Sequence, residues 1–131
     1  RNLGTIWRTA YNLGAAYTGQ IGGRYHRESA DTVACYRTVP HHVWEDPDDW
    51  YAHLPYDTVP VAIELTDDAE SLFTYNHPNR AVYVVGPEDG NIRKLVLDLC
   101  RDVVQIPSEL CLNQAQAAGM VMYDRVLKAS L

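Results

Sequence analysis

The sequence contains no long hydrophobic run, no opening signal segment and few cysteines. No stretch approaches the roughly 20 apolar residues that a membrane-spanning helix needs, and no basic-then-apolar segment opens the chain. The cysteines Cys35, Cys100 and Cys111 are odd in number, which does not suit a disulfide framework and fits a reducing compartment. We therefore expect a soluble, cytoplasmic protein, and its 131 residues, 47% of them hydrophobic, suffice for one domain with its own core.

The chain also lacks the excess of basic residues by which many proteins hold nucleic acid, because its formal net charge is −6. The charges are unevenly spread. Residues 1–37 carry five arginines and two acids, residues 38–79 carry nine acids and neither Lys nor Arg, and residues 80–131 carry six charges of each sign. We expect a polyanion to contact the N-terminal quarter, and the acidic middle to be a solvated face.

Apolar runs and helical spacings alternate along the chain. The strands are expected to be continuous apolar runs, which is typical of a parallel sheet covered on both faces. Their alternation with helices predicts an α/β fold with a mainly parallel sheet flanked by helices. The expected strands are residues 15–21, 59–65, 81–85 and 103–106. The expected helices are residues 1–14, a helix that starts near residue 47, and residues 92–100 and 112–127. Residues 22–43 are expected to be mostly loop.

Ligands of parallel α/β sheets bind beyond the carboxyl ends of the strands. Those ends fall at residues 64–65, 86–90 and 106–108. The segment 86–90 lacks the three-glycine dinucleotide fingerprint, and no Gly-Lys-Ser/Thr follows it as in a phosphate-binding loop. Taken alone, it favours a simple strand-to-helix turn with an Asp-Gly corner over a ligand-binding loop.

The sequence shows neither the residue pattern of a metal site nor that of a catalytic nucleophile. His41 and His42 are adjacent and point apart, and no cysteine stands at ligand spacing from them, so we expect no metal site. Cys111 has no His or Asp partner in the sequence, and no Gly-x-Ser-x-Gly elbow occurs. Arg8, on the first expected helix, would by itself be interpreted as a solvated charge.

Three segments, in this order, resemble the signatures of one enzyme family. Residues 2–10 (NLGTIWRTA), residues 85–90 (VGPEDG), and Ile106-Pro107 followed by Cys111-Leu112-Asn113 and an alanine-rich helix resemble the three motifs of the SpoU (TrmH-like) branch of the SPOUT RNA methyltransferases. Each motif is weak alone, whereas the ordered triple is specific and covers nearly the whole chain.

The resemblance implies a SPOUT α/β-knot fold, with residues 1–131 forming a single SpoU-type domain and a deep C-terminal trefoil knot over about residues 81–131. It further implies a homodimer that binds S-adenosylmethionine in the knot and methylates a ribose 2′-hydroxyl of tRNA or rRNA. Family members carry a strand before the first motif. Because this chain begins at the motif itself, we expect the domain to lack its first strand.

Roles follow from the matched positions. In many members Ser occupies the position of Cys111. We prefer Arg8 as a cation that stabilises the developing alkoxide, because a guanidinium keeps its proton at ordinary pH and is therefore a poor base. The resemblance implies catalytic roles for Arg8, Asn2, Glu88 and Asn113; a donor pocket lined by Ile63, Glu64, Leu65, Gly86, Ile106, Cys111 and Leu112; and RNA contacts from Arg8, Arg24 and Arg27.

Two other interpretations stay open. The acidic net charge also suits a knotted module that binds RNA or cofactor with weak or no catalysis. An unrelated small α/β enzyme whose motifs match by chance is the third interpretation.

Overall fold

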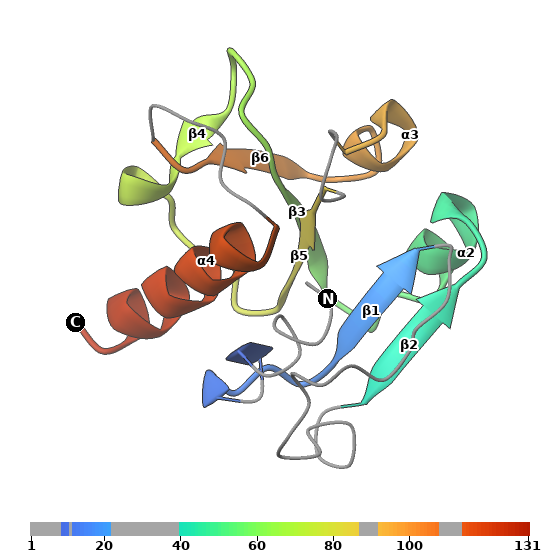
Figure 1. The fold of residues 1–131 in the computed structure, drawn as a ribbon, viewed down its shortest axis with the longest axis horizontal. Helices are drawn as coiled ribbons and strands as arrows, with labels where there is room; N and C mark the ends of the chain where they lie inside the picture. Colours follow the sequence, from blue (N-terminus) through green and yellow to red (C-terminus); the bar gives the residue numbers. More distant parts are fainter. Residues whose placement is uncertain (1–8, 11, 22–39, 87–91, 108–113) are drawn as a thin grey trace.

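The computed structural model describes residues 9–10, 12–21, 40–86, 92–107 and 114–131. Strands and helices are interspersed along this part of the chain (Figure 1). In chain order the elements are β1 (Thr18–Ile21), β2 (His41–Trp44), α2 (Pro47–Ala52), β3 (Val59–Ile63), β4 (Glu70–Ser71), the 3-10 turn η2 (Leu72–Thr74), β5 (Ala81–Val85), α3 (Lys94–Leu97), β6 (Asp102–Gln105) and α4 (Gln114–Ala129).

Every strand pair among the described residues is parallel, which confirms the predicted parallel sheet. The main sheet has the order β4-β6-β3-β5, and β1 and β2 form a separate pair. In the main sheet β3 is central: Ile63 lies opposite Val85 of β5 on one side and Val104 of β6 on the other. In the described part of the chain, no strand pairs with the outer edge of β5.

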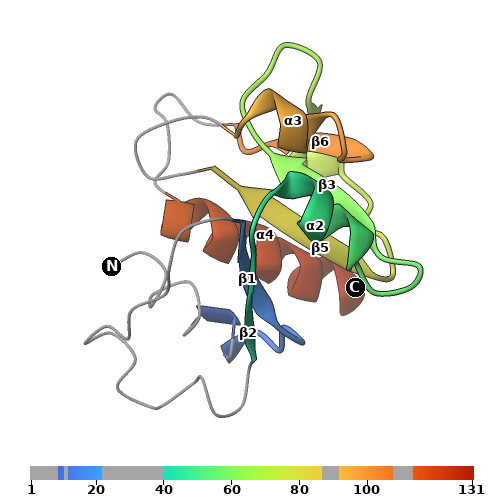
Figure 2. The ribbon, with the colours of Figure 1, turned by 90° about the vertical axis from the view of Figure 1, so that its right-hand side faces the viewer.

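The two faces of β3 enter two different hydrophobic clusters. Val61 and Ile63 pack with Val104 and with Val121 of α4, whereas Ala62 packs with Trp50 of α2 and with Ile92 and Val96 beside and within α3. Figures 1 and 2 accordingly show α4 on one side of the sheet and α2 on the other. Burial on both faces explains why the sequence of β3 is a continuous apolar run rather than an alternating one.

Local sequence signals set several ends of elements. Asp46 caps α2, because its carboxylate accepts a hydrogen bond from the Asp49 amide at 2.8 Å, and Pro47 occupies the first turn. The Leu13 amide donates to the Thr9 carbonyl at 3.0 Å, as in a helix, and Gly14 then adopts a φ of 79°. The predicted stop at Gly14 is therefore confirmed, because glycine adopts positive φ without steric cost.

The sequence-based boundaries were correct for β3, β5, β6 and α4 to within a few residues, but not everywhere. Residues 41–44 form β2, so the prediction that 22–43 is mostly loop is wrong at its end. The expected helix over 92–100 is one turn, α3. The expected strand over 15–21 is shorter, and it is half-exposed rather than buried. Strand β4 and turn η2 were not predicted.

No helix of the described residues is long and apolar enough to cross a bilayer.

Candidate functional site at the carboxyl edge of the sheet

The carboxyl ends of β3, β5 and β6 meet at one edge, as parallel pairing requires. Glu64 follows β3, Gly86 follows β5 and Ile106 follows β6. The Glu64 amide donates to the Val104 carbonyl at 3.0 Å, so the β3–β6 ladder continues one residue beyond β3 itself. The described residues of the three segments that the sequence assigned to strand ends, 64–65, 86 and 106–107, therefore lie at a common edge.

Two side chains tie this edge to the segments that follow it. The Oε2 atom of Glu64 accepts a hydrogen bond from the Ile92 amide at 3.1 Å, just before α3. The Nε2 atom of Gln114, the first residue of α4, donates to the Gly86 carbonyl at 2.5 Å. Strand ends β3 and β5 are thus linked to the starts of α3 and α4.

A cavity of about 1490 Å³ opens beside the outer edge of β5. At the carboxyl edge it is lined by Gly86, Ile92, Arg93 and Gln114. Further along it is lined by residues 15–21, which lead into β1 and form it, and by one side of α4. The edge therefore adjoins a hollow large enough for a cofactor-sized molecule.

The described residues of the predicted donor pocket lie at this edge. Ile63 is buried, Glu64 and Ile106 are half-buried, and Gly86 follows β5. The side chain of Leu65 is 62% exposed. The other predicted site residues lie outside the described residues: Asn2, Arg8, Arg24, Arg27, Glu88, Cys111, Leu112 and Asn113.

Sequence reasoning missed Gln114 and Ile92. Gln114 stands at the start of an alanine-rich helix that also carries Gln116, so the sequence does not indicate which of the two amide side chains contacts the edge of the sheet. Ile92 contributes its backbone amide, for which the sequence carries no signal.

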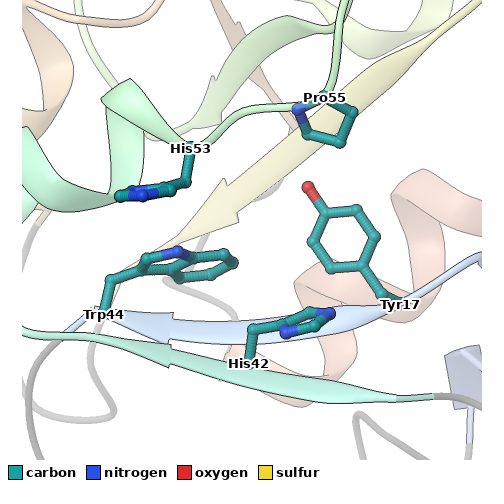
Figure 3. Close-up of a pocket in the computed structure, with 5 residues that line it drawn as sticks. All are labelled: Tyr17, His42, Trp44, His53 and Pro55. Atoms are coloured by element: carbon teal, nitrogen blue, oxygen red, sulfur yellow. The ribbon is translucent and has the colours of Figure 1, made fainter.

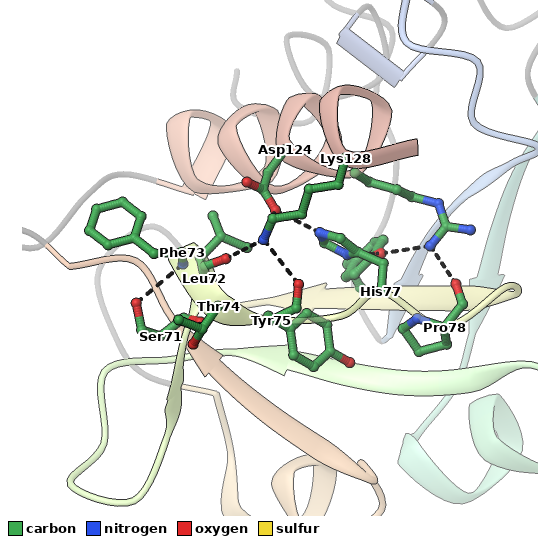
Figure 4. A network of polar contacts seen from close by, with 11 residues as sticks. Ser71, Leu72, Phe73, Thr74, Tyr75, His77, Pro78, Asp124 and Lys128 are labelled. Carbon is green, nitrogen blue, oxygen red and sulfur yellow. Dashed lines mark hydrogen bonds and ion pairs between the residues drawn. The ribbon is translucent and has the colours of Figure 1, made fainter. Parts of the chain in front are cut away.

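A network of polar side chains anchors α4 to the segment between η2 and β5 (Figure 4). His77 lies between Tyr83 and Asp124, with its Nδ1 2.6 Å from the Tyr83 hydroxyl and its Nε2 2.7 Å from Asp124. Because a carboxylate only accepts, Nε2 carries a proton. Lys128 donates to the Leu72 carbonyl at 2.6 Å and lies 2.8 Å from Asp124.

Electrostatics within this network favour the ionised carboxylate. Burial raises the pKa of Asp124, but the hydrogen bonds from Lys128 and His77 lower it by more, so its pKa lies below the ordinary value. Burial raises the pKa of the Tyr83 hydroxyl, although Arg125, which donates to it at 3.1 Å, opposes this shift. The network therefore holds α4 in place with ionised groups that are largely shielded from water.

A second, smaller pocket of about 300 Å³ lies on one face of the β1–β2 pair (Figure 3). Its walls are Tyr17, His42, Trp44, His53 and Pro55. The Trp44 ring lies against β1 at Gly19, where an added Cβ would come within 2.3 Å of it. None of these residues belongs to the carboxyl edge of the main sheet, but Tyr17, Trp44 and Pro55 also line the large cavity, so the two hollows adjoin.

No group of three or more His, Cys, Asp or Glu side chains in the described segments is arranged to hold a metal ion.

A parallel α/β sheet with an anchored carboxyl edge beside a large cavity is the arrangement in which α/β proteins commonly bind ligands at the strand ends. The chain matches the SpoU rRNA Methylase family over residues 1–123, and it belongs to that family. A search of curated protein sequences finds no significant match.

Solved structures share the fold. The SpoU methyltransferase AviRb from Streptomyces viridochromogenes is 24% identical with a TM-score of 0.82, over 97% of this chain and 54% of that one. The TrmH/SpoU tRNA modifying enzyme of A. aeolicus is 18% identical with a TM-score of 0.86, over 98% and 69%. An RNA 2′-O ribose methyltransferase is 22% identical with a TM-score of 0.77, over 99% and 52%. The chain thus spans about half the length of the first and third of these.

Proposed function

We propose that this protein transfers a methyl group from S-adenosylmethionine to a ribose 2′-hydroxyl of tRNA or rRNA. The observation that carries the proposal is the family match over residues 1–123, which includes all three segments that the sequence analysis singled out. One structure of AviRb is a complex with AdoMet, and another similar structure is described as an RNA 2′-O ribose methyltransferase. Both descriptions support the proposed reaction.

The carboxyl edge suits the methyl donor. Gly86 leaves its backbone accessible and the adjoining cavity supplies room, while Ile63 and Ile106 pack into the core at the ends of their strands. Leu65, Cys111 and Leu112 complete the proposed donor pocket, largely through backbone groups. When bound, S-adenosylmethionine supplies a methyl group that its sulfonium already activates, so positioning the ribose hydroxyl in line accounts for much of the rate.

The chain's own residues must then stabilise the hydroxyl as it loses its proton. We assign Arg8 to this developing negative charge and to the neighbouring phosphate, because a permanently charged guanidinium binds anions and is not a base. Asn2, Glu88 and Asn113 shape the active site, and Arg24 and Arg27 contact the RNA. The proposed roles of these residues require no metal ion.

We also propose that residues 1–131 form one domain, and that its C-terminal part, about 81–131, forms the trefoil knot. The order β4-β6-β3-β5 supports this, because the late strand β6 inserts between the earlier β3 and β4. The anchoring of α4 on residues 72–79 supports it as well. The odd number of cysteines supports a location in the cytoplasm.

The outer face of α4 suits a homodimer. Met120, Tyr123 and Leu127 recur at helical spacing and are 44%, 59% and 45% exposed, which is unusual for large apolar side chains in one stripe. A second copy of the chain would cover this stripe, and it would let Arg8 of one protomer approach the donor pocket of the other.

We expect Tyr123→Glu to convert a dimer into a monomer, because a carboxylate buried at the centre of an apolar interface is strongly unfavourable. Sedimentation velocity measures the change. Leu95→Glu is the matched control: Leu95 on α3 is 65% exposed, so this variant should sediment like the wild type. A Tyr123→Glu protein that stays dimeric would place the interface elsewhere.

The proposed donor site is tested by calorimetric titration with S-adenosylhomocysteine, the reaction product, which needs no knowledge of the RNA. We expect saturable binding close to one molecule per protomer. Folded protein that does not bind would rule out the methyltransferase assignment for this chain.

A further inference from the structure

Two hydrogen bonds hold the ends of the segment that joins β5 to α3. At one end, the Gln114 amide of α4 donates to the Gly86 carbonyl at 2.5 Å. At the other end, the Glu64 carboxylate, just beyond β3, accepts from the Ile92 amide at 3.1 Å. Both side chains are half-buried, and both act on backbone groups of residues that line the cavity beside β5.

These contacts fix the orientation of two peptide groups. Gly86 is followed by Pro87, which has no amide proton, so the Gly86 carbonyl is the one hydrogen-bonding group of that peptide. The Ile92 residue is 6% exposed, and its amide would be costly to leave unpaired. The charged acceptor on Glu64 makes this contact the stronger of the two.

We propose that Gln114 and Glu64 are positioning residues for the methyl donor, acting through Gly86 and Ile92 rather than by touching the reacting atoms. Their hydrogen bonds preform the edge on which the donor lies, so that binding need not order the ends of the 86–92 segment. This inference rests on the proposed function, since it assumes that the donor occupies this edge.

The test compares S-adenosylhomocysteine affinity across four variants by calorimetry. Gln114→Met keeps the length of the side chain and removes the donor, and Glu64→Met removes the acceptor. Each should weaken binding about 5- to 10-fold, which is the loss expected for one hydrogen bond of this kind. Glu64→Gln retains an acceptor oxygen and should restore affinity to within about 3-fold of the wild type.

Gln105→Met is the matched control. It removes another amide-to-carbonyl hydrogen bond, from Gln105 to the Ala69 carbonyl at 2.9 Å, which does not involve the 86–92 segment. We expect its affinity for S-adenosylhomocysteine to equal that of the wild type. Thermal unfolding of each ligand-free variant separates a positioning role from general loss of structure.

The outcomes are distinguishable from a failure of the proposed function. If the wild type does not bind S-adenosylhomocysteine, the proposed function is wrong. If the wild type binds and Gln114→Met and Glu64→Met bind equally well, the positioning role is wrong while the function stands. The positioning role is also wrong if affinity falls to the same extent in Gln105→Met, or only where part of the sample is unfolded.

Discussion

An Arg8→Ala variant is expected to lose methyl transfer by about 100-fold or more and still bind S-adenosylhomocysteine as the wild type does. The magnitude is that of removing one group that stabilises developing negative charge in a transition state. Binding is retained because Arg8 of either protomer is assigned to the ribose hydroxyl and the neighbouring phosphate, and not to the lining of the donor pocket. The measurement is transfer of a labelled methyl group to unmodified tRNA and rRNA, followed by alkaline hydrolysis, which 2′-O-methylation blocks at the modified position.

The control for this variant is Arg101→Ala. Arg101 is exposed just before the amino end of β6, away from the carboxyl edge and from both cavities, and its replacement should leave turnover unchanged. Unchanged turnover in Arg8→Ala would show that the catalytic assignment is wrong. A wild type that binds the product but methylates neither RNA would instead favour the knotted binding module without catalysis.

The second large effect that we expect is a loss of folding stability in the variant Asp124→Asn. This change keeps the shape of the side chain but removes the charge that faces His77 and Lys128, whose side chains are 6% and 27% exposed. Two charge-assisted hydrogen bonds are weakened, so we expect a loss of about 2 to 4 kcal/mol in the free energy of unfolding. Urea denaturation measures it.

Asp98→Asn provides a matched comparison, because Asp98 pairs with Lys94 at the same four-residue spacing. That ion pair is 3.2 Å long, but its side chains are 60% and 85% exposed. Solvent screens such pairs, and we expect a loss below about 1 kcal/mol. Equal losses in the two variants would show that burial does not strengthen the Asp124 contacts.

The effect of Asp124 should depend on pH in a defined direction. Although burial raises the pKa of Asp124, its hydrogen bonds lower it further, so the folded pKa lies below that of the unfolded chain. Such a carboxylate adds stability above the unfolded pKa of about 3.9 and loses it as the pH falls below that value. The stability gap between the wild type and Asp124→Asn should therefore be constant near neutrality and shrink below about pH 4. A gap of the same size at pH 3 and pH 7 would contradict this.

The sequence predicts a strand correctly where the strand's own residues show the pattern, and not where the strand forms only because a distant segment pairs with it. The runs of β3 and β5 are apolar throughout because both faces of the sheet are covered, and both were predicted. His41 and His42 in β2 resemble a polar loop, and they become a strand only because β1 offers a partner edge. Likewise Glu70 and Ser71 pair with residues 104 and 105, a contact that no local pattern encodes.

The position of the candidate site could be predicted from the sequence to a similar extent. Parallel strand ends mark where ligands bind, so Glu64, Gly86 and Ile106 could be placed at the site from the order of the strands along the chain. The hydrogen bonds of Glu64 to Ile92 and of Gln114 to Gly86 join residues 28 positions apart. Such contacts depend on how α3 and α4 return to the edge, and the spacing of residues does not encode this return.

The strand order has a consequence for how the chain folds as it is synthesised. Strands β3 and β5 can pair once residue 85 has emerged, but β4 must wait for β6, some 34 residues later in the chain. The face of β3 that carries Val61 and Ile63 stays open until α4 is complete, because Val121 and the Lys128 contacts to residues 72 and 75 come last. Contacts this distant in sequence slow folding and prolong the exposure of apolar surface. A nascent chain stalled before residue 114 therefore exposes the apolar face that α4 later covers. At this stage the chain offers a chaperone its largest apolar surface for binding.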